Sequence, residues 1–158
     1  MGFCFGFYCN DANLAGCALA TFRETLRQPG GAPHGWGLAY FQADQPLIRK
    51  QPKASAGPLD FVDLAGHLRS SVVLGHLRDA TVGGLRTENT HPFRFRGWTF
   101  CHIGTLDRFD VIKADLLQSV PEFIRRNIRG TTDSEVVFHL FLSFLNDTGK
   151  LEDPRVPP

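Results

Sequence analysis

The sequence lacks a surplus of charge of either sign, because 17 basic residues stand against 16 acidic ones and the formal net charge is +1. This balance argues against binding to nucleic acid or to an anionic membrane. Its four cysteines form no CxxC pair and no dense framework, so we expect reduced thiols and a cytoplasmic protein. The histidines and cysteines show no spacing typical of metal ligands, and we expect no metal or other cofactor.

Long apolar runs are missing as well. The N-terminus has no basic start followed by an extended apolar stretch, which argues against a secretion signal. The longest apolar stretch, inside SEVVFHLFLSFL, is too short and too interrupted to span a bilayer. What the chain does have is 158 residues, 42% of them hydrophobic and 21% charged, as in an ordinary globular protein. We predict one domain over residues 1–150, with 151–158 as a Pro-rich tail or truncation point.

The hydrophobic pattern predicts a mixed order of strands and helices, and hence an α+β layered architecture. In the predicted helix 11–27, Leu14, Ala18, Phe22 and Leu26 share one face. The last predicted helix is apolar nearly all round, which favours burial on two sides. Strands are expected at 3–8, 35–41, 46–51, 71–80 and 98–104, and helices at 11–27, 58–69 and 133–146.

Four short motifs stand out against this background. HGWGLAYF (34–41) places Trp36 between two glycines, and GHLRDATVGG (75–84) places Arg78 at a strand end before a loop. NTHPF (89–93) is a predicted turn. Two further segments, FCHIGTLDRF (100–109) and GTTDSE (130–135), both place small residues at the ends of predicted elements. Taken singly, they are explained by turns, a core tryptophan and a surface arginine. An arginine at such a place can also fork onto a carboxylate, and element ends often hold anions.

Taken together and in this order, the motifs resemble those of the class II glutamine amidotransferases, which are N-terminal nucleophile hydrolases. The resemblance extends from residue 2 to about residue 146. It implies the αββα sandwich of that superfamily, glutamine as substrate and no cofactor. The chemistry implied is hydrolysis of the glutamine side-chain amide to glutamate and ammonia, with the ammonia passed to an acceptor on a synthase domain or partner protein.

The resemblance also implies roles for individual residues. Arg78 would bind the α-carboxylate of glutamine, and Asp133, in the TDSE segment, would bind its α-ammonium group. The backbone N–H of Gly104 would contribute to the oxyanion hole. Trp36, Thr90 and His91 would line or shape the pocket.

Two positions depart from the family pattern. The register set by Phe5-Gly6 places the family's nucleophilic cysteine at position 2, where this chain has Gly2. The family's oxyanion asparagine falls at Ile103, whose side chain cannot donate a hydrogen bond. Loss of an oxyanion donor typically costs ~10²–10³ in rate and loss of a nucleophile on the order of 10⁶. Cys4 is a poor substitute, because no terminal amine adjoins it, so we expect the chain to be nearly inactive as a glutaminase.

Two alternatives remain open at this stage. In the first, the chain is a non-catalytic module that senses glutamine or docks a partner. In the second, it is a copy of an active parent that was altered by design or during cloning, since Cys to Gly at position 2 and Asn to Ile at position 103 each need one base substitution. Family members are also considerably longer. We therefore expect an oligomer, a swapped copy or a C-terminal segment to complete the layers around helix 133–146.

Overall fold

The computed structural model describes residues 2–26, 34–52 and 67–152. The predicted helix 58–69 and the tail 151–158 lie mostly outside these residues. The strands are β1 (Phe3–Tyr8), β2 (Gly35–Gln42), β3 (Gln45–Gln51), β4 (Val72–Arg78), β5 (Phe93–Phe95) and β6 (Trp98–Phe100). The helices are α1 (Leu14–Leu26), the 3₁₀ turn η1 (Thr87–Asn89), α3 (Phe109–Ser119), α4 (Glu122–Arg125) and α5 (Asp133–Asp147).

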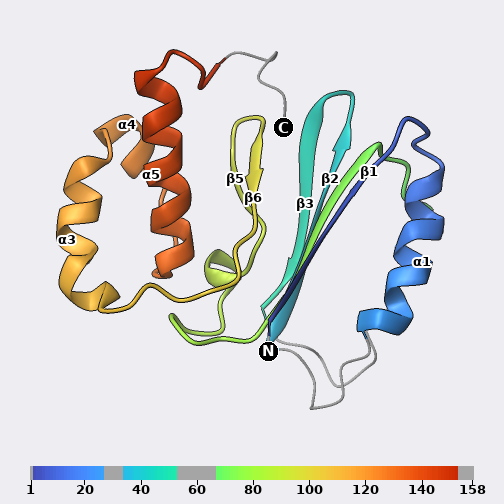
Figure 1. Ribbon diagram of the computed structural model, residues 1–158, viewed down its shortest axis with the longest axis horizontal. Helices are drawn as coiled ribbons and strands as arrows, with labels where there is room; N and C mark the ends of the chain where they lie inside the picture. Colours follow the sequence, from blue (N-terminus) through green and yellow to red (C-terminus); the bar gives the residue numbers. More distant parts are fainter. Residues whose placement is uncertain (1, 27–33, 53–66, 153–158) are drawn as a thin grey trace.

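The elements form layers in the order helix, sheet, sheet, helix (Figure 1). The first sheet has four antiparallel strands in the order β1-β4-β2-β3, and the second is the β5-β6 hairpin. Helix α1 covers the outer face of the first sheet, and α3, α4 and α5 lie beyond the hairpin. The predicted α+β class is confirmed.

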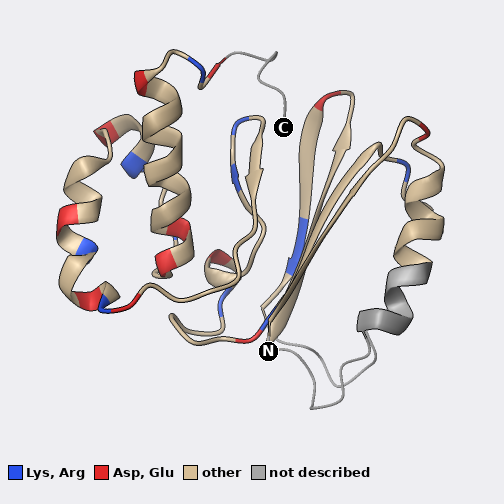
Figure 2. Ribbon diagram, in the orientation of Figure 1, with Lys and Arg blue, Asp and Glu red and all other residues tan. Residues whose placement is uncertain are grey.

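Strand alternation builds the core between α1 and the first sheet. Phe5 on β1, Leu38 on β2 and Val73 on β4 are buried there against Ala15 and Leu19 of α1. Because neighbouring residues of a strand point to opposite faces, the residues between them point toward the β5-β6 hairpin. Figure 2 shows that the first sheet carries little charge, apart from β3 and the end of β4.

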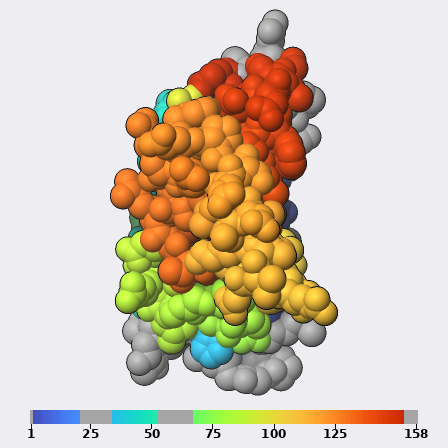
Figure 3. Space-filling model, turned by 90° about the vertical axis from the view of Figure 1, so that its left-hand side faces the viewer, coloured from blue at the N-terminus to red at the C-terminus, as the bar shows by residue number. Residues whose placement is uncertain are grey.

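A second core lies between the hairpin and α5. Phe93 and Phe95 of β5 pack in one cluster with Phe138 and Leu142 of α5. The helix begins after Thr132, whose Oγ1 accepts a hydrogen bond from the backbone N–H of Glu135, as in a standard N-cap. Helices α3, α4 and α5 cover the upper and middle part of the face seen in Figure 3, and the segment that follows β4, in green, lies below them.

Three sequence predictions need correction or completion. In α1 the buried side chains include Ala15 and Leu19, whereas Leu14 is 46% exposed, so over the described side chains the core face is offset by one residue from the one predicted. The side chains of Phe22 and Leu26 lie outside the described part. The predicted strand 98–104 ends at Phe100, because its next partner would be Pro92, which has no N–H to donate.

Helix α5 also differs from its prediction. Phe141 and Phe144 of α5 are 44% and 59% exposed, so within the described part of the chain this helix is not buried on two sides.

Helices α3 and α4 were not predicted. Arg108 precedes α3 in the left-handed conformation (φ 52°) and makes no side-chain capping bond, so the usual N-terminal signal is absent. Pro121 precedes α4, again without a side-chain cap. Both helices contact α5, and tertiary packing therefore supplies the stability that local signals do not.

Gly37 of β2 lies close to the backbone of the segment that leads into β5, and a substitution there tests this close approach. A Cβ atom added at Gly37 would lie 1.9 Å from the carbonyl oxygen of His91. Since this neighbour is backbone, we expect Gly37→Ala to lower the free energy of unfolding by ~3 kcal/mol or more. The matched control is Gly6→Ala, in β1 of the same sheet, where the added Cβ would meet nothing within 4 Å. Urea unfolding of both variants measures the difference, and equal stabilities would contradict the close approach.

Candidate functional site

A cavity of about 250 Å³ opens where the N-terminal end of β1, the end of β4, the segment after β6 and the start of α5 meet. Six of the eight site residues named from the sequence line it: Gly2, Arg78, His91, Ile103, Gly104 and Asp133. The others that line it are His76, Asp79, Thr81, Val82, His102, Thr105, Thr132 and Ser134.

Trp36 and Thr90 are not among the residues that line the cavity. Trp36 is buried in the core beneath α1, and its Nε1 donates to Oε1 of Gln51 at 3.1 Å. Thr90 is fully buried, and its Oγ1 donates to the carbonyl oxygen of Arg86 at 2.9 Å. Both residues support elements beside the cavity.

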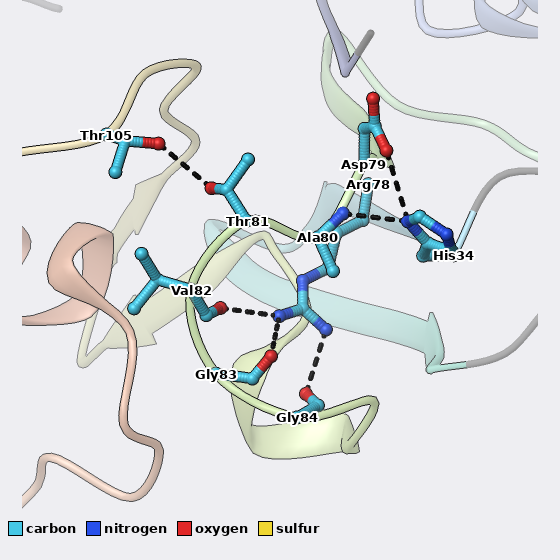
Figure 4. Close-up of polar contacts among 9 residues, drawn as sticks. All are labelled: His34, Arg78, Asp79, Ala80, Thr81, Val82, Gly83, Gly84 and Thr105. Atoms are coloured by element: carbon cyan, nitrogen blue, oxygen red, sulfur yellow. Dashed lines mark hydrogen bonds and ion pairs between the residues drawn. The ribbon is translucent and has the colours of Figure 1, made fainter.

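Arg78 is held by the loop that follows β4 (Figure 4). Its Nη2 donates to the carbonyl oxygens of Val82 and Gly83 at 2.9 and 3.1 Å, and its Nη1 donates to that of Gly84 at 3.0 Å. Burial lowers the pKa of the guanidinium, which nevertheless remains a cation. Among the described residues no carboxylate pairs with Arg78, and its three bonds leave about two of the five N–H donors of a guanidinium free.

Two contacts fix the position of this loop. His34 Nδ1 accepts a hydrogen bond from the backbone N–H of Ala80 at 2.9 Å and lies 3.1 Å from Oδ1 of Asp79. On the opposite side, the hydroxyls of Thr81 and Thr105 are 2.9 Å apart. The loop after β4 is thereby joined to the segment after β6, and these two segments form facing walls of the cavity.

Asp133 occupies the first turn of α5 and is 3% exposed. Its Oδ2 accepts from the backbone N–H of Leu106 at 2.8 Å, and its Oδ1 accepts from that of Ser134 at 2.8 Å. A carboxylate has about four lone-pair sites, so acceptor capacity remains for a cationic group in the cavity. Asp133 therefore both anchors the segment after β6 and presents negative charge beside it.

Glu135 and Asn89 stabilise the loop before α5. The Glu135 carboxylate accepts from the backbone N–H groups of Arg129 and Gly130 at 2.9 and 2.7 Å. Burial raises the pKa of Glu135, against the effect of these two hydrogen bonds. Asn89 Oδ1 accepts from the backbone N–H of Thr131 at 2.8 Å. The first turn of α5 is thus held by two buried polar side chains.

Three histidines, His76, His91 and His102, line the cavity. The rings of His76 and His91 are 4.2 Å apart between centroids. Burial lowers the pKa of His76 to about 4 and that of His91 to about 2, so both are neutral near pH 7. His102 Nδ1 lies 3.0 Å from Oγ of Ser134. His76 could have been found from the sequence, because it shares a strand face with Arg78 two residues later.

Gly2 and Ile103, where the resemblance places the family's cysteine and asparagine, differ in the space around them. A Cβ at Gly2 would lie 3.3 Å from the backbone carbonyl oxygen of Leu77, so a side chain there requires a backbone shift of a few tenths of an ångström. Ile103 is 52% exposed at the cavity. Gly104 has φ +145°, a conformation that favours glycine, and its backbone lies beside the ring of His102.

The described residues show neither a metal site nor a membrane-spanning helix. Within residues 2–26, 34–52 and 67–152, no group of three or more His, Cys, Asp or Glu side chains is arranged to hold a metal ion. No helix in the described part of the chain has the length and apolarity needed to cross a bilayer.

Comparison with known proteins gives one family. The family model for class II glutamine amidotransferases matches residues 1–156. The chain is 33% identical over 127 residues to the probable glutamine amidotransferase DUG3 of Saccharomyces cerevisiae, covering 77% of this chain and 35% of that protein. It is 29% identical over 155 residues to the putative glutamine amidotransferase YafJ of Escherichia coli, covering 93% of this chain and 56% of that protein.

A solved structure agrees with this result. The glutamine aminotransferase class-II domain protein from Silicibacter pomeroyi superposes with a TM-score of 0.57 at 27% identity, covering 73% of this chain and 51% of that one. The chain thus spans about a third to just over half the length of the proteins compared here.

Proposed function

Because this chain belongs to the class II glutamine amidotransferases, we propose that its cavity binds glutamine. The observation that carries the proposal is the placement of Arg78 and Asp133 on the same cavity. Free guanidinium donors complement an α-carboxylate, and a carboxylate with free lone pairs complements an α-ammonium. These are the roles that the family resemblance assigns to the two positions.

We further propose that the chain binds glutamine without hydrolysing it. In the family, the N-terminal cysteine attacks the side-chain carboxamide and its own amine carries the proton, while an asparagine side chain and a glycine N–H stabilise the oxyanion. Gly2 has no thiol to attack with, and Ile103 places an apolar side chain where the amide donor belongs. Of these groups, the Gly104 N–H remains, together with the terminal amine of residue 2 once Met1 is removed. Binding without turnover suits a sensing or docking module, whose partner is a protein that responds to glutamine.

Calorimetric titration with glutamine and two analogues tests this proposal. We expect weak binding of glutamine, with Kd on the order of 1 mM. Glutaramate lacks the α-ammonium group and 4-aminobutanamide lacks the α-carboxylate, so each should bind at least about tenfold more weakly. These ligand changes leave the protein intact, which matters because Arg78 also holds its loop.

Matched variants extend the test to the protein. Arg78→Ala should abolish glutamine binding, whereas Arg125→Ala, which changes an exposed arginine on α4, should not alter it. Absence of any glutamine binding, or binding that is equal for glutamine and both analogues, would overturn the proposal. If the unmodified chain steadily releases ammonia from glutamine, the proposed glutamine site stands but the proposed lack of hydrolysis is wrong.

A further inference from the structure

A second cavity, of about 610 Å³, lies between β3, the start of β5, the loop before α5 and the first turns of α5. It shares no lining residue with the cavity that Arg78 and Asp133 line. Its volume falls in the range of small-molecule sites. The wall of this second cavity carries three basic residues, Lys50, Arg94 and Arg129, which come from three separate parts of the fold.

Strand geometry directs Lys50 into the second cavity. Lys50 pairs with Gly37, at the point where β2 approaches the backbone of His91. Opposite residues of an antiparallel pair lie on the same face, so Lys50 points toward the hairpin, and its Nζ lies 5.1 Å from the centroid of the Phe93 ring. Arg49 points to the other face of the sheet, so the charge that enters the cavity from β3 is that of Lys50. In Figure 2 these two basic residues form the blue part of β3.

The three cations of the second cavity lack counterions. Among the described residues, no carboxylate forms an ion pair with Lys50, Arg94 or Arg129. Glu135 also lines the cavity, but its two oxygens accept backbone N–H groups of the loop before α5, and Glu88 is exposed. Burial lowers the pKa of Lys50 to about 8, although the charge of Glu135 acts in the opposite direction. An anionic ligand would therefore relieve a cost that the fold itself leaves in place.

His139 of α5 adds an unused hydrogen-bond acceptor. It lines the second cavity and is 2% exposed. Its Nδ1 lies 2.8 Å from the carbonyl oxygen of Glu135. Because a carbonyl only accepts, Nδ1 carries the hydrogen and Nε2 is left as an acceptor. Nε2 is buried and has no hydrogen-bond partner in the described part of the chain, and burial lowers the pKa of His139, which keeps the ring neutral. A ligand that brings an O–H group would satisfy this nitrogen.

We propose that the second cavity is a binding site for inorganic phosphate. Lys50 and Arg129 make no side-chain hydrogen bond within the described residues, and Arg94 uses only its Nε, which donates to the carbonyl oxygen of Arg96 at 3.0 Å. Ammonium and guanidinium donors therefore remain for the phosphate oxygens. The hydroxyl that hydrogen phosphate keeps at neutral pH donates to Nε2 of His139. This inference goes beyond the proposed function and does not rest on glutamine binding, so either can fail without the other.

Titration calorimetry with inorganic phosphate tests the proposal on the whole chain, at neutral pH and with the ionic strength held constant by sodium chloride. We expect saturable binding with Kd on the order of 1 mM. Sulfate has the same tetrahedral shape and a double charge but no hydroxyl, so it leaves Nε2 of His139 without a donor and should bind at least about tenfold more weakly. This comparison changes only the ligand and does not depend on the folding of any variant.

Matched lysine variants show whether the phosphate lies in the second cavity. Lys50→Met keeps an apolar side chain of similar length and removes the charge, so it should weaken phosphate binding at least about tenfold. Lys113→Met removes a lysine whose Nζ lies 5.5 Å from the centroid of the Phe109 ring, on α3 and outside the second cavity, and should leave the binding unchanged. The proposal is overturned by a lack of saturable phosphate binding, by equal binding of phosphate and sulfate, or by equal phosphate binding in Lys50→Met and the unmodified chain.

Discussion

Restoring two side chains should convert this protein into a glutaminase. The double variant Gly2→Cys/Ile103→Asn, with Met1 removed, is expected to release ammonia from glutamine. Since a lost nucleophile costs on the order of 10⁶ in rate and a lost oxyanion donor ~10²–10³, the gain over the unmodified chain should reach several orders of magnitude.

The geometry of the cavity supports this expectation. Position 2 takes a Cβ if the backbone near the Leu77 carbonyl shifts by a few tenths of an ångström, and residue 103 is exposed at the cavity beside the Gly104 backbone. Arg78 and Asp133 line the same space, so the substrate contacts need no redesign. Neither single variant should suffice, because a nucleophile without the oxyanion donor is slow and the donor without a nucleophile has nothing to stabilise.

The test is to measure ammonia release from glutamine by the double variant, with the unmodified chain and both single variants in parallel. A glutamine-like electrophile should label residue 2 of the double variant and leave Cys4 unlabelled. Mass spectrometry of the N-terminus confirms that Met1 has been removed. A folded, processed double variant that binds glutamine and still releases no ammonia would contradict the assignment of positions 2 and 103.

Acidification should destabilise the fold strongly, through His76 and His91. Burial holds their pKa values at about 4 and about 2 in the folded protein, against an ordinary value of 6.5. The unfolded chain therefore takes up protons below pH 6.5 that the folded protein does not, and the stabilisation present above pH 6.5 is lost as the pH falls. Between pH 6.5 and 4.5 the two residues together should remove ~4 kcal/mol, a large part of the stability of an ordinary domain.

Burial is the main cause of both lowered pKa values and sets the sign of the effect. For His76, a hydrogen bond with the backbone of His102 raises the pKa, and the charge of Arg78 lowers it further. For His91, the charges of His76 and Lys50 add to the effect of burial on the pKa. Neither His91 nitrogen has a hydrogen-bond partner, so nothing stabilises its protonated form.

Urea unfolding at a series of pH values measures this effect. His91→Leu, which replaces the ring by an apolar side chain of similar volume, should reduce the acid sensitivity by about half. His67→Gln, at an exposed position, should leave it unchanged. If the free energy of unfolding falls equally with pH in His91→Leu and in the unmodified chain, His91 is not the origin of the effect.

The local sequence by itself determined the parts of the fold that short-range patterns encode. Apolar patterns correctly predicted β1, the Gly35–Gln51 hairpin and β4. The capping residue Thr132 and the apolar residues that follow it correctly predicted α5. The order of the short motifs was enough to indicate the family. From that resemblance came the set of positions, Gly2, Arg78, Ile103, Gly104 and Asp133 among them, that line one cavity.

Only the tertiary structure decided which distant side chains meet. Asn89 Oδ1 accepts a hydrogen bond from the backbone N–H of Thr131 at 2.8 Å, yet the two residues are far apart in the sequence and nothing local in either segment marks the other as its partner. The same holds for the neutral pair His76 and His91, whose low pKa values depend on burial between layers. Helix α3 also depends on packing against α5, because Arg108 provides no cap. Periodicity reports which face of an element is apolar, whereas contacts across the sandwich depend on how the layers are stacked.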